Sequence, residues 1–101
     1  MKPLVSITGH IATFYQLMKC DQDWAMSNGV SEASARKFTS SFYSSLAQGA
    51  DSCTDSFEQL IDHASTPGGL NAQSLTHLKG TEHYPLQAES LQLILNRLLG
   101  K

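Results

Sequence analysis

Few residues in this sequence have types and spacings that could do chemistry. The four histidines lie at widely separated positions: His10, His63, His77 and His83. No two of them are three or four residues apart, the spacing that places two metal ligands on one face of a helix, and HExxH is absent. His10, near the start of the first predicted helix, is expected to be locally satisfied, although a pocket role is the alternative. We therefore predict no metal site and no catalytic residue in this chain.

Carboxylates and nucleophiles form no catalytic pattern either. Asp21 and Asp23 are two residues apart on a predicted helix, where their side chains point in different directions, so we expect a solvated face. No GxSxG motif is present to build a serine nucleophile. Cys20 and Cys53 have no CxxC spacing, and they are expected to be reduced thiols of a cytoplasmic protein. A single disulfide between them is the alternative.

One loop does have a suggestive composition, namely Thr66-Pro67-Gly68-Gly69-Leu70-Asn71. Proline stiffens its entry, and two glycines let the backbone turn its N–H groups to one side. A helix is predicted immediately after it. Free N–H groups at a helix N-terminus favour an anion such as a carboxylate, and the Thr66 and Asn71 side chains add hydrogen-bonding groups. An ordinary connection between two helices has the same composition, so the residues alone leave both interpretations open.

The elements that position this loop are predicted to be helices, and we expect an all-α fold of about five. They cover about 6–28, 31–48, 55–64, 70–78 and 84–99. Asn28-Gly29 is a helix stop and Ser31 an N-cap, while Gly49 and Gly80 are expected to end helices. Thr54 or Asp55 is expected to cap the third helix, and Tyr84-Pro85 opens the last. Only residues 4–7 could form an extended stretch.

Apolar residues recur at helical spacing along each segment. The predicted inward positions are Ile7, Ile11, Phe14, Met18 and Ala25, then Ala35, Phe38, Phe42 and Leu46, then Phe57, Leu60, Ile61 and Ala64, then Leu75 and Leu78, and finally Leu91, Ile94, Leu95, Leu98 and Leu99. Two helices of about 20 residues are roughly 30 Å long. The three short helices are too small to cover such faces. We therefore expect a second copy of the chain to cover them.

Length and charge exclude several classes of protein. The 101 residues suffice for one domain, which we place at residues 1–101. Seven scattered Lys and Arg with a net charge of −2 supply no basic face for nucleic acid. No run of about 18 apolar residues predicts a membrane span, and the first 17 residues are too polar for a signal peptide. Neither GxGxxG nor GxxxxGK[ST] occurs, so no nucleotide site is expected.

The loop and its surroundings resemble a known family. Thr66 to Gln73 reads TPGGLNAQ and is similar to the Ser/Thr-Pro-Gly-Gly loop in the C-terminal dimerisation domain of pyrroline-5-carboxylate reductases. A long first helix, an Asn-Gly stop, a second long helix and a leucine-rich last helix follow the family order. Trp24, Leu70-Asn71 and residues 95–98 (LNRL) resemble a divergent branch of NAD(P)-dependent oxidoreductases within that family.

The resemblance implies a role for this chain. Family members carry an N-terminal Rossmann domain that binds NAD(P)H, followed by a helical domain that interlocks with that of a second subunit. The loop would hold the carboxylate of a small cyclic imino acid, whose C=N bond is reduced. By this resemblance the substrate-binding residues are Thr66, Pro67, Gly68, Gly69, Leu70 and Asn71, with the N–H groups of Gly69 and Leu70 approaching the carboxylate. The cofactor would bind the parent enzyme, and this chain alone is expected to be inactive.

Two departures from the family pattern bear on the substrate. Asn71 stands where the typical member has a threonine, and Thr8-Gly9-His10-Ile11-Ala12 replaces a Gly-Ser-Gly-Pro-Ala segment. The Rossmann half is missing, so the chain is expected to be an excised domain or a truncated product, and its end at Lys101 fits a natural C-terminus. A free-standing helical interaction module is the alternative function. A small-molecule carboxylate binder is a third possibility.

Overall fold

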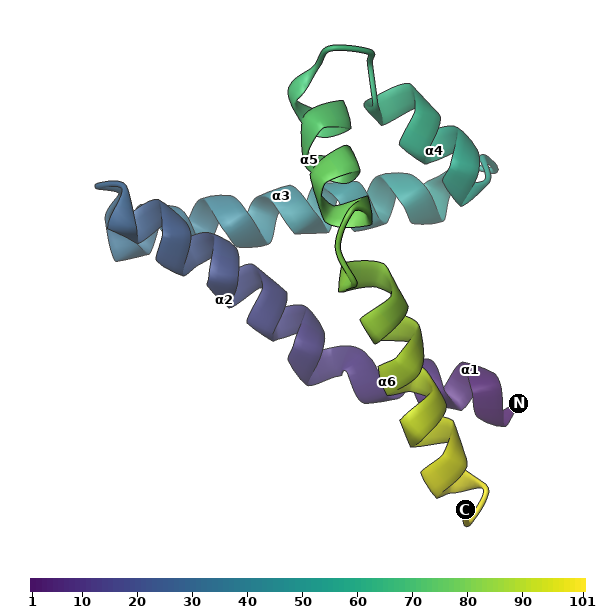
Figure 1. Cartoon of the computed structure of the whole chain (residues 1–101). Helices are drawn as coiled ribbons and strands as arrows, with labels where there is room; N and C mark the ends of the chain where they lie inside the picture. The colour runs from purple at the N-terminus through teal and green to yellow at the C-terminus, as the bar shows by residue number, and fades with distance from the viewer. The chain divides into compact units, whose positions relative to one another are not determined.

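The computed structural model describes residues 1–101 as helices joined by short turns, without a strand (Figure 1). The elements in order are α1 (Lys2–Ile7), the 3₁₀ helix η1 (Thr8–His10), α2 (Ile11–Ser27), α3 (Glu32–Ser52), α4 (Phe57–Ala64), α5 (Leu70–Lys79) and α6 (His83–Leu98). This confirms the predicted all-α class. The chain divides into two compact units. We call residues 11–54 the hairpin unit, and residues 1–10 together with 55–101 the loop-bearing unit.

The hairpin unit consists of α2 and α3, and its turn follows from local residue types. Gly29 has a φ of 93°, its N–H donates to the Met26 carbonyl at 3.1 Å, and the Val30 N–H donates to the Ala25 carbonyl at 3.1 Å. These two bonds are those of a Schellman motif, in which glycine accepts the left-handed conformation at little cost. Ser31 then caps α3 by accepting from the Ser34 N–H at 3.2 Å. The predicted stop and cap are both confirmed.

Small residues allow α2 and α3 to approach each other. Ala35 and Thr39 are buried on α3, with 3% and 9% of their surfaces exposed. The rings of Phe14 and Tyr43 meet edge to face with centroids 6.0 Å apart. The Tyr43 hydroxyl donates to the Asp21 carboxylate at 2.5 Å. Asp21 is exposed, as predicted, and its carboxylate also joins the two helices.

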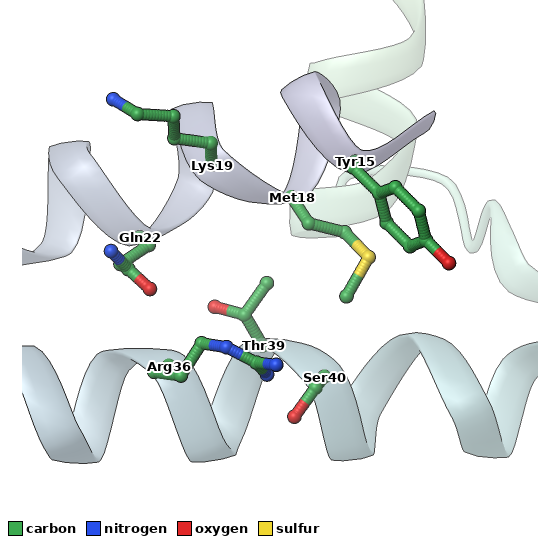
Figure 2. A pocket seen from close by; sticks show the side chains of 7 residues that line it. All are labelled: Tyr15, Met18, Lys19, Gln22, Arg36, Thr39 and Ser40. Atoms are coloured by element: carbon green, nitrogen blue, oxygen red, sulfur yellow. The ribbon is translucent and has the colours of Figure 1, made fainter. Parts of the chain in front are cut away.

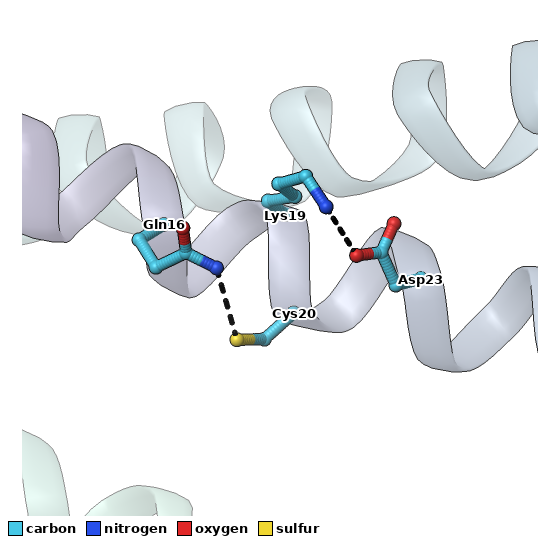
Figure 3. Close-up of polar contacts among 4 residues, drawn as sticks. All are labelled: Gln16, Lys19, Cys20 and Asp23. Atoms are coloured by element: carbon cyan, nitrogen blue, oxygen red, sulfur yellow. Dashed lines mark hydrogen bonds and ion pairs between the residues drawn. The ribbon is translucent and has the colours of Figure 1, made fainter.

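Local polar contacts run along α2 between residues one helical turn apart (Figure 3). Lys19 and Asp23 form an ion pair at 2.6 Å, one helical turn apart. The Gln16 amide donates to the Cys20 sulfur at 3.6 Å. Asp23 is exposed, as predicted, and both Cys20 and Cys53 are exposed free thiols.

The loop-bearing unit brings the two ends of the chain together. Helix α1 packs against α6, and α5 also contacts α6. The Lys2 ammonium group donates to the Leu98 carbonyl at 3.1 Å, and His10 Nε2 lies 3.1 Å from the Ser90 hydroxyl. Gly9 in η1 lies so close to α6 that an added Cβ would come within 2.7 Å of Ile94 Cδ1. The expectation that His10 is satisfied locally is therefore wrong, because Ser90 is distant from it in the sequence.

Several predicted boundaries are wrong for identifiable reasons. Residues 4–7 are helical, and the first helix is interrupted at η1, where the Thr8 hydroxyl donates to the Val5 carbonyl at 2.6 Å. Helix α3 continues through Gly49 to Ser52 because one glycine costs only about 1 kcal/mol within a helix. Helix α4 begins after Ser56, since Ser56 and Gln59 form a capping box that Thr54 and Asp55 do not.

The single chain has almost no interior. Ala35 is its only buried apolar residue, and the other buried residues are Ser6 and Thr39. Leu75 and Leu78 are half-buried rather than buried, as are Leu91, Ile94 and Leu95, whereas Phe57, Ile61 and Ala64 are exposed rather than turned inward. The predicted apolar residues therefore do share helix faces, but most of these faces are exposed to solvent in a single copy of the chain. No helix has the length and hydropathy needed to cross a lipid bilayer.

Candidate functional site

The predicted substrate loop lies in the loop-bearing unit as a tight turn between α4 and α5. The Gly69 N–H donates to the Thr66 carbonyl at 2.8 Å, which closes a four-residue turn. Pro67 occupies the second position and Gly68 the third, where its φ is 78°. This arrangement is typical of a type II turn, which needs proline's fixed φ and then a residue that tolerates positive φ. The sequence thus dictates the shape of the turn.

Gly69 is required for a different reason. Its φ is −87°, which any residue adopts, but a Cβ at this position would lie 3.0 Å from the Thr66 carbonyl oxygen. A side chain would therefore press on the carbonyl that closes the turn. Gly69 also serves as N-cap of α5, and its carbonyl accepts the first helical hydrogen bond, from the Gln73 N–H at 3.1 Å.

The start of α5 leaves backbone donors available. No side chain caps this helix, so the N–H groups of Leu70, Asn71 and Ala72 have no cap acceptor. The helix dipole adds partial positive charge at this end. The expectation that the Gly69 N–H approaches a carboxylate needs correction, because that N–H is already bonded to Thr66. Donation to an anion would fall to Leu70 and the residues after it.

All six predicted site residues belong to this turn and the first two positions of α5. Thr66, Pro67, Gly68 and Asn71 are exposed, Gly69 is half-buried, and Leu70 has 84% of its surface exposed. No charged side chain occurs between residues 64 and 78. Recognition by this segment alone would therefore depend on backbone N–H groups, the Thr66 hydroxyl and the Asn71 amide.

A second candidate surface, missed by sequence reasoning, is a groove between α2 and α3 (Figure 2). It has a volume of about 400 Å³ and is lined by Tyr15, Met18, Lys19, Gln22, Arg36, Thr39 and Ser40. The Met18 side chain points toward α3, whereas the Lys19 ammonium points away from it. The sequence does have small residues on α3 and long side chains on α2, a combination that can leave a groove between two helices. The pattern of one helix alone does not show where it crosses the other, so the groove could not be located.

The electrostatics of the hairpin unit stabilise helices rather than prepare a reaction. Burial, followed by the hydrogen bond to Asp21, raises the pKa of Tyr43 to about 12. The hydrogen bond to Asp23 raises the pKa of Lys19. Both shifts hold the proton on its residue, so neither group is poised to transfer one near neutral pH. No three His, Cys, Asp or Glu side chains gather where they could hold a metal ion.

Comparison with known proteins identifies the family. A family model described as pyrroline-5-carboxylate reductase dimerisation matches residues 1–98. No curated protein and no solved structure shows a significant match. The matched residues include all seven helical elements and the whole Thr66–Asn71 turn. The chain therefore belongs to the pyrroline-5-carboxylate reductase dimerisation family.

Proposed function

We propose that this chain is the dimerisation and substrate-loop domain of an NAD(P)H-dependent oxidoreductase that resembles pyrroline-5-carboxylate reductase. One observation carries the dimerisation part of the proposal. The chain has a single buried apolar residue, while large apolar side chains on almost every helix are exposed. Burying one such side chain contributes about 1.5–3 kcal/mol, so a second copy that covers several of them supplies what one copy lacks.

The substrate part of the proposal concerns a small cyclic imino acid. Its carboxylate would accept hydrogen bonds from the Leu70 and Asn71 N–H groups at the positive end of α5. The Asn71 side-chain amide would add two donors and one acceptor beside the ring nitrogen. Pro67 and Gly68 would act through the turn, which fixes the direction of those N–H groups before the substrate arrives.

The residues of this chain do not fit the nicotinamide cofactor. Binding a dinucleotide needs a strand, a glycine-rich turn and a helix, and the structure has no strand and no GxGxxG. We therefore assign NAD(P)H to an upstream Rossmann domain of the parent protein, and we assign no chemical step to residues present here. The two exposed thiols, Cys20 and Cys53, support a cytoplasmic location for the parent.

Analytical ultracentrifugation of the 101-residue chain tests dimerisation. We expect a dimer of 11.0 kDa chains at micromolar concentration, with a helical circular dichroism spectrum. A monomer at that concentration, retaining the same helical spectrum, would contradict the proposal. Activity gives a second test, because the chain alone should not oxidise NADPH in the presence of a cyclic imine. Fusion to the Rossmann domain encoded upstream should restore this reaction.

An NMR titration tests the loop. L-Proline, used as a stable stand-in for the imino acid, should move the amide resonances of Leu70 and Asn71 more than that of Gly69, whose N–H is already bonded. Prolinamide, which lacks the carboxylate, is the matched control and should leave them unchanged. Unmoved Leu70 and Asn71 resonances at millimolar proline would argue against carboxylate binding. The reading frame upstream of Met1 separates the alternatives: a Rossmann fingerprint favours the reductase, and a stop codon favours a free-standing helical module.

A further inference from the structure

Helix α4 is an amphipathic helix that packs only weakly in its own unit. Phe57, Leu60, Ile61 and Ala64 form one stripe at helical spacing, and 75% of the surface of Phe57 is exposed. Packing in the loop-bearing unit joins α1 and α5 to α6, and α4 makes no comparable contact. Glu58 and Asp62 lie one helical turn apart on the same side of the stripe, so one border of the apolar face is acidic.

The first half of α3 presents a matching surface. A shallow groove lies along this half of the helix, and Lys37, Phe38 and Ser41 are among its lining residues. Phe38 also borders an adjoining apolar cavity of about 330 Å³, together with Trp24 and Phe42. The surfaces of Phe38 and Trp24 are 74% and 70% exposed. Lys37 is an exposed cation beside them, and the one ion pair of the chain is between Lys19 and Asp23.

We propose that α4 of a second copy docks on this surface of α3, with the stripe of Phe57 on Phe38 and Trp24, and with Glu58 beside Lys37. The inference rests on the proposed dimerisation and names the surfaces that meet. The apolar stripe would meet an aromatic patch, and its acidic border would meet a basic residue, so hydrophobicity and charge agree. In a two-fold dimer the contact occurs twice, once in each direction.

Charge reversal in matched chains tests the contact. Lys37→Glu and Glu58→Lys change exposed residues, so helicity should be preserved. Each variant alone should dimerise roughly tenfold more weakly, because two attractive pairs become repulsive in each dimer. An equimolar mixture should recover the wild-type dissociation constant, since a heterodimer pairs the reversed α4 with the reversed α3 and the two native surfaces with each other. Half-molar salt should shrink the difference. Lys79→Glu and Glu89→Lys, two other exposed charges, serve as controls.

Each outcome of this experiment has one meaning. Recovery on mixing supports contact between copies. If the two variants dimerise as tightly as the wild type, the surfaces do not meet, although dimerisation itself stands. If each is weakened and the mixture does not recover, the charges act within one chain or on another partner, and the docking proposal is wrong. A wild-type chain that stays monomeric overturns both this inference and the proposed function.

Discussion

The two units of this chain are stabilised in different ways. The hairpin unit is one continuous stretch, residues 11–54, whose two helices meet over Ala35 and Thr39. The loop-bearing unit joins the chain ends, with contacts between Lys2 and Leu98 and between His10 and Ser90. Contacts that are close in sequence cost less loop-closure entropy, so the hairpin should form first and the loop-bearing unit later.

The hairpin unit and the loop-bearing unit also differ in what they expose. Trp24 and Phe38 are the most exposed aromatic residues of the hairpin unit, and they would offer apolar area to a second copy. The loop-bearing unit holds a polar turn whose direction depends on α5, and α5 depends on α6. A change in the hairpin should therefore affect association, whereas a change in α6 should also affect the loop.

The largest expected effect comes from α6. In Leu95→Asp, a carboxylate replaces a half-buried side chain on the face of α6 that carries Leu91 and Ile94. An unpaired charge on such a face should reduce the free energy of unfolding by about 2–4 kcal/mol. Gln87→Asp introduces the same charge at an exposed position of the same helix and should have little effect. Thermal melting measures both, and an unchanged Leu95→Asp midpoint would show that this face of α6 is not packed.

A smaller effect is expected in the hairpin. Ala35→Leu inserts three carbon atoms at the buried apolar position of α3, so the helices must separate or the side chain must adopt a strained rotamer. Overpacking of this kind costs about 1–3 kcal/mol. Ala47→Leu adds the same atoms at an exposed position of α3 and is the matched control. Equal urea midpoints for the two variants would mean that the burial of Ala35 does not limit the approach of the helices.

Tyr43→Phe should cost about 1 kcal/mol by removing the hydrogen bond to Asp21. It should also change the response to alkali. The pKa of Tyr43 is raised to about 12 in the folded chain, so the phenol keeps its proton where the unfolded chain, with a pKa near 10, loses it. The stabilisation is complete below pH 10 and disappears as the pH rises toward 12. The difference in stability between wild type and Tyr43→Phe should therefore shrink over that interval.

Tyr15→Phe provides the control for this measurement. Tyr15 lies on the same unit, with 62% of its surface exposed, and none of the structure's hydrogen bonds joins its hydroxyl to a neighbour. Its replacement should leave stability unchanged at neutral and at alkaline pH. A difference between wild type and Tyr43→Phe that stays constant up to pH 12 would contradict the assigned role of the Tyr43–Asp21 bond.

Sequence patterns predicted the features that depend on neighbouring residues. Asn28-Gly29 and Ser31 have the turn and cap chemistry that their types require, and Pro67-Gly68 forms the turn expected of them. The interruption at η1 was not predictable, because Gly9 fits against Ile94, a residue distant in sequence. The same limit applies to the buried faces, which depend on surfaces that a single chain does not supply.

The candidate site also has some features that depend on neighbouring residues and others that depend on distant ones. Its residues and the type of turn could be read from the sequence, because proline and glycine restrict φ locally. The sequence could not show which N–H groups are free, because the Gly69 N–H had two possible partners, the Thr66 carbonyl and a ligand. The groove between α2 and α3 depends on the register of two helices, which helical periodicity alone does not fix.

The smallest expected effect lies at the start of α4. Ser56 accepts from the Gln59 N–H at 3.1 Å, and the Gln59 side chain accepts from the Ser56 N–H at 2.8 Å. Ser56→Ala removes one half of this capping box, a loss typically worth about 1 kcal/mol. Because α4 packs only weakly in its unit, the loss should appear as faster amide exchange in residues 57–64 at chain concentrations below the dissociation constant of the dimer. Global melting should change little.

Ser31→Ala removes the corresponding cap from α3 and sharpens the contrast. Helix α3 is packed against α2, so fraying of its first turn should be resisted by tertiary contacts, and the cost should appear in the global transition. If α4 docks on a second copy, the faster exchange in Ser56→Ala should also disappear at concentrations where the chain is dimeric. Exchange that stays fast at those concentrations would show that α4 remains unpartnered, which would count against its docking on α3.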